Sequence, residues 1–540
     1  MQGSMMQMPL NVSALLQYAD RHHGDTEIVS RRVEGGFHRT TWRELHTRTR
    51  QLANALTMFG LEPGERVATL AWNGHRHLEL YYAVGGSGKV VHTINPRLLP
   101  EQIAWMLNHS QARVLFFDTT FLPLVEAIAP HCKALDHLVV MTARAHMPVS
   151  AKLPILVCYE EIVDAASTYF EWPELDENSA CGICYTSGTT GNPKGVLYSQ
   201  RATILHAYAS ALPDALCMSS RDVVLPVVPM FHVNAWGLPY SAALAGAKLV
   251  LPGPALDGKS LHELMEYERV TFAAGVPTIW QGLLQYASTQ GVRFTTLRRT
   301  VIGGSACPPS MIRTFEQEHG VEVIHAWGMT ELSPLGAVSR LKARHLGLPK
   351  ADQQKVLEKQ GHAIFGIDMK IVDEQGDELP WDGKAFGELM VRGPWVIEKY
   401  FGIDESPLQG GWFPTGDVAT IDADGYMQIT DRAKDLIKSG GEWISSIELE
   451  NHAAAHPAVA LAAVIGVPHP KWDERPLLLV VKKPGAEASR EELLKFFDGK
   501  VARFAIPDDV LFTEALPLTA TGKVHKLKLR EQHRSHLMPL

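Results

Sequence analysis

The sequence has few cysteines, no long apolar run and no excess of positive charge. Six cysteines in 540 residues are too few to hold a fold together by disulfides. The most notable apolar run, Ala458 to Val467, is interrupted by Gly466 and is much shorter than the roughly 20 residues that cross a membrane. The formal net charge of −8 gives no general attraction to nucleic acid or anionic lipid.

The beginning of the chain also lacks a basic segment followed by a continuous apolar stretch, so we expect no secretory signal. These features predict a protein of the reducing cytoplasm, with no transmembrane segment and no nucleic-acid partner. Cys181 and Cys184 form a C-x-x-C pair, a pattern that occurs in redox sites. However, they lie in the apolar run CGICYTSG, which predicts a buried strand, and residues i and i+3 of a strand face opposite sides. A structural role is therefore favoured.

The chain is long enough for two to four domains, and its texture changes along its length. Residues 41–60 predict a helix, in which Thr41 and Glu44 have the spacing of a capping box. Strands and helices then alternate to about residue 141, and again from about Val223 to Ala337, which predicts parallel sheets covered on both faces. From about His362, short strands with Gly and Asp turns indicate an antiparallel part.

The final part of the chain returns to a mixed texture and predicts a small, separate α+β domain. The boundary is expected in the polar turn between Asp431 and Lys438, which gives domains at residues 1–433 and 434–540. The expected fold class is α/β with α+β. A large N-terminal domain would contain two α/β subdomains and a small β-rich subdomain, and a small α+β C-terminal domain would follow.

The most informative segment is YTSGTTGNPKG, residues 185–195. Its glycines allow backbone N–H groups to approach an anion closely, its hydroxyl groups add donors, and its lysine adds a positive charge. This combination suits a polyphosphate, although a mobile surface loop can have a similar composition. A Walker P-loop is disfavoured, because no hydroxyl residue follows the lysine and the next residues, GVLYS, predict a strand. The candidate phosphate ligands are Thr186, Ser187, Gly188, Thr189, Thr190, Gly191 and Lys194.

This segment resembles the phosphate loop of the adenylate-forming superfamily, which contains acyl-CoA synthetases, luciferases and the adenylation domains of peptide synthetases. Further segments follow in the order of that superfamily: GGSACP, HAWGMTE, GWFPTGD, DRAKDLIK and PLTATGK. The resemblance covers nearly the whole chain, and the strings FHVNAWG and KSGGEWIS suit the medium- and long-chain fatty acyl-CoA ligases best. It implies that Mg²⁺ and ATP activate a fatty acid to acyl-AMP with release of pyrophosphate, and that coenzyme A (CoA) then accepts the acyl group.

The resemblance also assigns residues to the nucleotide and the metal. Trp327 offers a flat face for the purine, although a core tryptophan is the alternative, and Asp417 with Arg432 would bind the ribose. Glu331 would contact Mg²⁺ together with a hydroxyl of the phosphate loop, which we assign to Thr186. The other residues expected near the nucleotide are Gly304, Ser305, Ala306, His325, Ala326, Gly328, Met329, Thr330, Lys434, Lys438 and Trp443.

Lys523 is expected to be the main catalytic residue, with Thr330 and Glu331 in support. A lysine can stabilise the charge that builds on the α-phosphate when a carboxylate attacks it. Lys434 stands at the position of the family's hinge, about which the small domain swings between the two half-reactions. Gly440 and Gly441 would then admit the pantetheine arm of CoA, although a simple glycine turn is the alternative.

The positions that bind the acid in this family are apolar or small here. They contain no obvious arginine or lysine for a second carboxylate and no aspartate for an amino group, which favours an acid with an apolar tail. One of them, Trp236, either gates an acyl tunnel or packs in the core. The expected acid-pocket residues are His232, Val233, Trp236, Gly275, Val276, Pro277 and Gly303.

Several alternatives stay open at this point. The acyl acceptor could be a carrier protein instead of CoA, the adenylate could be oxidised as in luciferases, or the acid could be aromatic. A sensor that binds nucleotide and acid without turnover is the remaining class. The sequence leaves the length of the acyl chain and the oligomeric state undetermined. The resemblance is compatible with a homodimer and with peripheral contact to a membrane.

Overall fold

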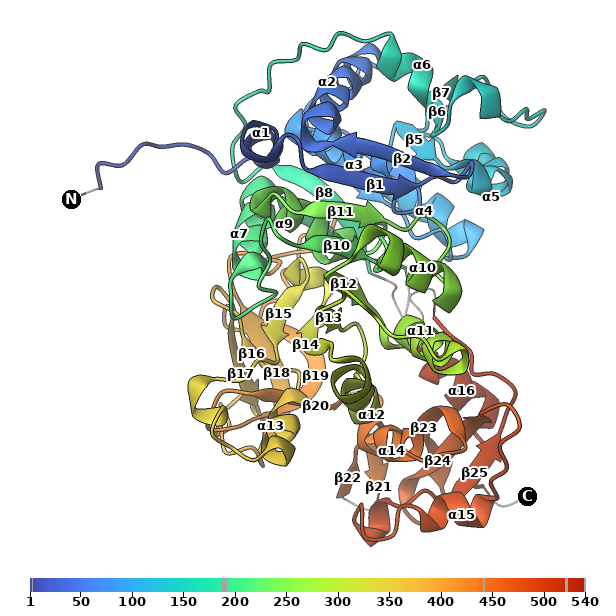
Figure 1. Cartoon of the computed structure of the whole chain (residues 1–540). Helices are drawn as coiled ribbons and strands as arrows, with labels where there is room; N and C mark the ends of the chain where they lie inside the picture. Colours follow the sequence, from blue (N-terminus) through green and yellow to red (C-terminus); the bar gives the residue numbers. More distant parts are fainter. Residues whose placement is uncertain (2, 187–191, 433, 440–441, 520–522, 539–540) are drawn as a thin grey trace.

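The computed structural model describes residues 1, 3–186, 192–432, 434–439, 442–519 and 523–538. These residues form four β-sheets: two large ones with helices on their faces, a four-stranded antiparallel one, and one in the C-terminal part (Figure 1). This arrangement confirms the predicted fold class. Within the described ranges, no helix combines the length and the apolarity that crossing a bilayer requires.

The first large sheet has seven strands in the order β7-β6-β5-β3-β4-β8-β9, and its neighbours run parallel except for β8 and β9. Its strands are β3 (Arg66–Leu70), β4 (Val90–Thr93), β5 (Val114–Phe117), β6 (His137–Val140), β7 (Leu156–Cys158), β8 (Ala180–Tyr185) and β9 (Gly195–Ser199). The associated helices are α2 (Trp42–Met58), α3 (His75–Gly86), α4 (Pro100–Ser110), α5 (Leu122–Ile128), α6 (Tyr159–Asp164) and α7 (Gln200–Ala211).

The second large sheet has nine strands in the order β16-β15-β14-β13-β12-β10-β11-β1-β2. Its strands are β1 (Glu27–Arg31), β2 (Phe37–Thr41), β10 (Val223–Pro226), β11 (Lys248–Leu251), β12 (Phe272–Gly275), β13 (Arg299–Ile302), β14 (Glu322–Gly328), β15 (Leu335–Val338) and β16 (His362–Ala363). Its helices are α1 (Val12–His23), α8 (Val233–Trp236), α9 (Leu238–Ala245), α10 (Gly258–Glu268), α11 (Pro277–Gln290), α12 (Pro309–Arg313) and α13 (Lys350–Leu357). The β1–β2 hairpin thus joins a sheet whose other strands come much later in the sequence.

The two remaining sheets are mainly antiparallel. One contains β17 (Asp368–Val372), β18 (Phe386–Arg392), β19 (Phe413–Ile421) and β20 (Met427–Arg432). The C-terminal one contains β21 (Ile437–Ser439), β22 (Glu442–Ile444), β23 (Val459–His469), β24 (Asp473–Lys482) and β25 (Asp509–Phe512), with α14 (Ser446–Ala454), α15 (Arg490–Lys495) and α16 (Lys526–His533). The buried side chains of this part form apolar clusters of their own, separate from those of the rest of the chain.

Two local predictions from the sequence are confirmed. The helix α2 begins with the expected capping box, because Thr41 accepts a hydrogen bond from the backbone N of Glu44 and the Glu44 carboxylate accepts one from the backbone N of Thr41. Cys181 and Cys184 both lie buried on β8 and contact different neighbours, the hydroxyl of Thr203 and that of Thr93 respectively. Burial raises the pKa of both thiols, which opposes redox chemistry.

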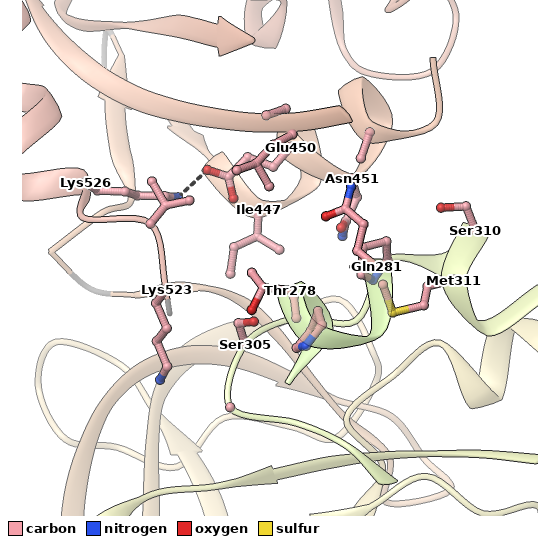
Figure 2. A pocket seen from close by; sticks show the side chains of 18 of the residues that line it. Thr278, Gln281, Ser305, Ser310, Met311, Ile447, Glu450, Asn451, Lys523 and Lys526 are labelled. Atoms are coloured by element: carbon pink, nitrogen blue, oxygen red, sulfur yellow. Dashed lines mark ion pairs between the residues drawn. The ribbon is translucent and has the colours of Figure 1, made fainter. Parts of the chain in front are cut away.

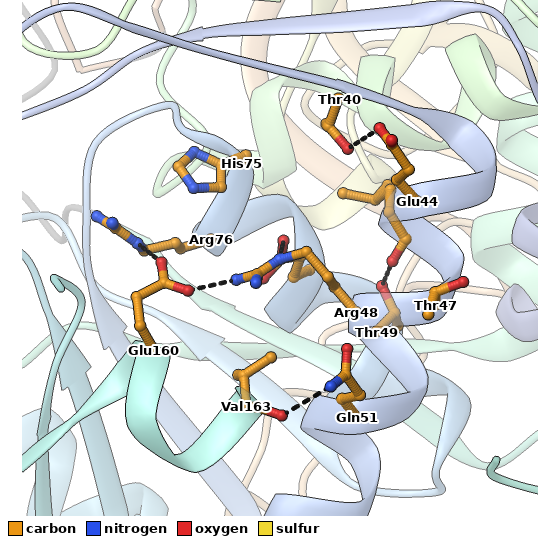
Figure 3. Close-up of polar contacts among 12 residues, drawn as sticks. Thr40, Glu44, Thr47, Arg48, Thr49, Gln51, His75, Arg76, Glu160 and Val163 are labelled. Atoms are coloured by element: carbon orange, nitrogen blue, oxygen red, sulfur yellow. Dashed lines mark hydrogen bonds and ion pairs between the residues drawn. The ribbon is translucent and has the colours of Figure 1, made fainter. Parts of the chain in front are cut away.

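A buried network of charges joins α2, α3 and α6 (Figure 3). Arg48 pairs with Glu79 at 2.7 Å and with Glu160 at 2.8 Å. Arg76 pairs with Glu160 at 2.6 Å and with Glu34 at 2.7 Å. The side chain of Glu79 is fully shielded from solvent, so its charge is compensated by protein groups alone. Such a network holds its helices in one arrangement, because any missing partner leaves a buried charge uncompensated.

Replacement of Glu79 by Gln should lower the free energy of unfolding by about 3 kcal/mol, because Arg48 then loses a shielded negative partner. The measurement is urea unfolding followed by circular dichroism. Asp368→Asn provides a matched control, since Asp368 pairs with Arg392 at 2.7 Å but both side chains are more than half exposed. Equal destabilisation by the two substitutions would contradict a special contribution from the buried network.

Candidate active site

Two adjoining cavities lie between the large sheets, the four-stranded sheet and the C-terminal part. The first has a volume of about 410 Å³ and the second of about 630 Å³. Of the residues singled out in the sequence, the first is lined by Thr186, His232, Val233, Trp236, Gly303, Gly304, Ala326, Trp327, Gly328, Met329, Thr330, Glu331, Arg432, Lys434 and Lys523. The second adds Pro277, Ser305, Ala306 and Asp417.

The larger cavity separates the C-terminal part from the rest of the chain (Figure 2). Thr278 and Gln281 of α11 lie on one wall, and Glu450 and Asn451 of α14 lie on the other. Lys523 extends into this space from the segment that precedes α16. Gln281 also bridges the two walls, because its side-chain N donates a hydrogen bond to the backbone O of Ala460.

The segment expected to bind phosphate is closed at its base. The backbone N of Thr186 donates to the backbone O of Lys194 at 2.9 Å, and the backbone N of Lys194 donates to the hydroxyl of Thr186 at 3.3 Å. These bonds hold the two ends together where β8 and β9 diverge, beside the cavity that Thr186 lines. The intervening expected ligands, Ser187, Gly188, Thr189, Thr190 and Gly191, lie outside the described residues.

Glu331 lies just after β14 and is held by Tyr400, whose hydroxyl donates to its carboxylate at 2.8 Å. Burial raises the pKa of Glu331, while the bond from Tyr400 acts in the opposite direction. The Lys194 ammonium lies 4.8 Å from the centre of the Tyr400 ring, which connects this glutamate to the phosphate segment. One carboxylate and the hydroxyl of Thr186 at one cavity fit a Mg²⁺ ion that completes its shell with water and phosphate.

Asp417 and Arg432 are opposite each other on β19 and β20. The Arg432 Nε lies 2.7 Å from one oxygen of the Asp417 carboxylate, and the indole N–H of Trp327 donates to the other oxygen at 2.9 Å. Gly336 leaves room for the Trp327 ring, because a Cβ there would lie 2.5 Å from it. The carboxylate is therefore fixed in orientation at the cavity wall, and the indole that orients it also lines the cavity.

Lys523 is surrounded by other cations. Burial lowers its pKa to about 8, and the positive charges of Arg432 and Lys434 act in the same direction, while the carboxylates of Asp417 and Glu331 oppose them. The backbone N of Lys523 donates to the hydroxyl of Thr519 at 3.1 Å, which closes the short segment that carries the lysine. The same cavity thus brings the C-terminal lysine together with Thr186 from the large sheet.

The lining of the smaller cavity also includes a group of apolar residues, Leu216, Leu238, Ala274, Val301 and Leu335. The indole of Trp236 packs over the backbone at Gly303 and Gly304. Its turn is unusual, because Val233, Asn234, Ala235 and Trp236 all have positive φ values. Consecutive left-handed residues other than glycine are costly and are maintained only by their surroundings. Burial lowers the pKa of the nearby His232 to about 4, so this imidazole is neutral at pH 7.

Some expected residues do not line these two cavities. The ring of His325 is buried and bonds to the backbone N of Cys307 and the backbone O of Glu358, so it supports the 303–308 segment instead. Gly275 accommodates the Trp280 ring, which would lie 2.7 Å from a Cβ at that position. Lys438 and Trp443 contact each other on the β21–β22 hairpin. Val276 lines a smaller neighbouring cavity. Gly440 and Gly441 lie outside the described residues.

The sequence reasoning missed several residues at the site. Tyr400 and Tyr198 carry no motif signal, yet Tyr400 holds Glu331 and the hydroxyl of Tyr198 donates to the backbone O of Thr330 at 2.8 Å. Thr415 lies inside the segment GWFPTGD, and its hydroxyl accepts from the backbone N of Asp417 at 3.1 Å. A motif signal was therefore available for Thr415 but not for the two tyrosines.

Comparisons with known proteins agree with this geometry. The family model described as AMP-binding enzyme matches residues 15–401, and that of the AMP-binding enzyme C-terminal domain matches residues 448–523. A 3-methylmercaptopropionyl-CoA ligase of Ruegeria lacuscaerulensis is 56% identical over 99% of this chain and 100% of its own length. A medium-chain-fatty-acid–CoA ligase of Ectopseudomonas oleovorans is 52% identical over 100% of this chain and 98% of its own length.

Among solved structures, an anthranilate CoA ligase in complex with anthranoyl-AMP has a TM-score of 0.87 and 26% identity, and the match covers 98% of this chain and 99% of that one. The matched models together include the phosphate segment, the strand ends around Trp327 and the lysine at position 523. The chain therefore belongs to the AMP-binding enzyme family and is an AMP-forming acyl-CoA ligase, an acid–thiol ligase.

Proposed function

We propose that this ligase activates medium- or long-chain fatty acids, with Mg²⁺-bound ATP as the adenylating substrate and CoA as the acceptor. The apolar part of the lining of the smaller cavity is the observation that carries this proposal. The charged residues that line the smaller cavity come from the segments assigned to nucleotide, metal and hinge. They are Glu331, Arg432, Lys434, Asp435 and Lys523. The apolar lining residues would therefore contribute only apolar contacts to a substrate tail. They are Leu216, Leu238, Ala274, Val301 and Leu335.

In the first half-reaction, a carboxylate oxygen attacks the α-phosphorus of ATP, and the bond to the leaving pyrophosphate breaks. Lys523 stabilises the negative charge that develops on the α-phosphate. The carboxylate of Asp417, oriented by Arg432 and Trp327, accepts hydrogen bonds from the ribose. Mg²⁺ held by Glu331 and Thr186 would supply charge neutralisation for the phosphates.

In the second half-reaction, the C-terminal domain, residues 434–540, rotates about Lys434. This rotation withdraws Lys523 and brings the β21–β22 hairpin, with Lys438 and Trp443, to the adenylate. The CoA thiol, after loss of its proton, attacks the acyl carbon, and AMP leaves. The proposed boundary between residues 433 and 434 agrees with the end of β20 at Arg432 and the start of β21 in another sheet at Ile437.

A second candidate substrate is 3-(methylthio)propanoate, because the ligase for this acid in Ruegeria is 56% identical to the chain. Its thioether tail is short and uncharged, and sulfur is well tolerated in apolar surroundings. It would occupy only part of an apolar wall that a longer acid can cover. The length of the acid that the enzyme prefers therefore distinguishes the two candidate substrates.

A substrate panel tests the proposed acid. AMP release with CoA should give the highest kcat/KM for straight-chain acids, with a gain of about fourfold for each methylene added until the cavity is full, since each buried CH₂ contributes about 0.8 kcal/mol. The panel comprises butanoate, 3-(methylthio)propanoate, octanoate, palmitate and benzoate. A dicarboxylic acid of eight carbons is the control and should be at least 100-fold poorer than octanoate. A preference for benzoate or for the dicarboxylate would refute the fatty-acid assignment, and turnover only with a carrier protein would refute CoA.

Replacement of Lys523 by Ala should reduce acyl-AMP formation at least 100-fold, because a charge that stabilises the transition state is lost. The same variant should still form the thioester from supplied acyl-AMP and CoA. The two steps are measured separately, by acid-dependent ATP–pyrophosphate exchange and by thioester release. Lys528→Ala, at an exposed position of α16, is the matched control. Equal losses in both steps would contradict the assigned role.

The depressed pKa of Lys523 predicts a pH dependence. The pKa of Lys523 in the free enzyme is about 8, so the charged form of this lysine, which adenylation requires, is lost as the pH rises through this value. The kcat/KM for ATP in the exchange reaction should therefore fall about fivefold between pH 8 and pH 9, and should approach a tenfold fall for each further pH unit. Lys523→Arg should lack this decline in whatever activity it retains, since arginine stays protonated throughout. If kcat/KM of Lys523→Arg declined with the same midpoint pH, the decline would belong to the titration of another group.

A further inference from the structure

Arg97 belongs to none of the motifs of the family, yet it follows the strand that pairs with the one leading into the phosphate segment. It follows β4, which pairs in parallel with β8, with Thr93 opposite Cys184. The carboxyl ends of parallel neighbours emerge at the same edge of a sheet, so the segment after β4 and the segment after Tyr185 leave side by side. The hydroxyl of Thr93 lies 3.2 Å from the sulfur of Cys184, which shows how closely the two ends pack.

Arg97 also borders the same space as the catalytic lysine. A small cavity of about 60 Å³ is lined by Arg97, Asn95, His232, Gly304 and Lys523, together with apolar side chains. It shares its His232, Gly304 and Lys523 walls with the 410 Å³ cavity and therefore forms a side branch of it. Two cations from distant parts of the sequence thus face one branch.

The lining of this branch is cationic and apolar. Its lining within the described residues contains no carboxylate, while the main cavity contains Glu331 and Asp435. Arg97 has no ion pair with any described carboxylate, in contrast to Arg432, which pairs with Asp417. Arg97 is exposed to solvent, although partial desolvation lowers its pKa. Apolar neighbours such as Phe231 and Ile279 line the rest of the branch.

The turn that carries Arg97 is ordered locally. The backbone N of Arg97 donates to the side-chain oxygen of Asn95 at 3.0 Å, and the Asn95 side chain is almost fully buried. This bond fixes the turn two residues before the arginine, as aspartate and asparagine side chains commonly do. The backbone position of Arg97 is thus set by the large domain and does not depend on the C-terminal domain.

We propose that Arg97 and Lys523 form an anion site for the β- and γ-phosphates of ATP and for the pyrophosphate that they become. This inference rests on the proposed function of adenylate formation at the cavity. When the carboxylate attacks, the bond between the α-phosphorus and the bridging oxygen breaks, and pyrophosphate leaves with the electron pair. A guanidinium can bind two of its oxygens at once, which suits a polyanion better than a single ammonium does. Because Arg97 belongs to the large domain, it retains pyrophosphate contacts even when Lys523 withdraws.

Binding measurements on the full chain test the site without any acid substrate. Calorimetric titration with magnesium pyrophosphate should give a Kd at least tenfold weaker for Arg97→Gln than for the parent, because a charge-assisted bidentate contact is lost. The Kd for AMP, which lacks the two outer phosphates, should change less than twofold. Arg97→Lys keeps the charge but loses the fork, so its pyrophosphate Kd should be intermediate. Arg21→Gln, an exposed arginine at the end of α1, is the matched charge control.

Several results would overturn the site. An unchanged pyrophosphate Kd in Arg97→Gln would exclude a direct contact, and equal weakening of AMP and pyrophosphate would indicate a general disturbance of the cavity. A change confined to the KM for the acid or for CoA would assign the arginine to another ligand. If the glutamine variant does not fold, Arg97→Lys carries the same comparison. Because no acid is present, failure of the fatty-acid assignment and failure of this site are distinguishable.

Discussion

The active site depends on positive charges gathered at one cavity, where Lys523, Arg432 and Lys434 meet the carboxylates of Asp417 and Glu331. Lys523 lies near Arg432 and Lys434, and burial together with these cations lowers its pKa to about 8. Such an arrangement costs folding free energy in the absence of a ligand, since like charges are held in a poorly solvated space. A triphosphate removes that cost on binding. Confining these cations makes the unliganded state less stable. Binding of an anion relieves this repulsion, and the affinity for the anion is higher for that reason.

The same constraint bears on the proposed rotation of the C-terminal part. Lys523 and the β21–β22 hairpin belong to one small unit with its own apolar clusters. In the present arrangement the lysine lines the cavity, and Lys438 and Trp443 do not. Because both elements are carried by the same unit, the proposed rotation would bring them to one cavity in turn. The scheme of two half-reactions therefore agrees with the way that the residues are distributed over the fold.

Much of the fold was predictable from the sequence, because alternation of apolar segments and the capping box at Thr41 report local structure directly. Residues that cluster in motifs, such as Thr186, Trp327 and Lys523, do lie together at one cavity. A motif position does not by itself report contacts that depend on tertiary neighbours. Gly275 makes room for Trp280, and His325 supports a segment from behind, although both stand in motif positions. The left-handed turn at Val233 could not be foreseen either, since local preference disfavours it at a β-branched residue.

The contact between Gln281 and Ala460 has a consequence for how the two parts of the enzyme can diverge. The acceptor is a backbone oxygen, so the bond does not depend on which side chain stands at position 460. Substitutions on that strand can accumulate without loss of this docking contact, provided that the strand keeps its path. A recognition element of this kind lets the C-terminal part change its surface during evolution while it keeps the same docking position.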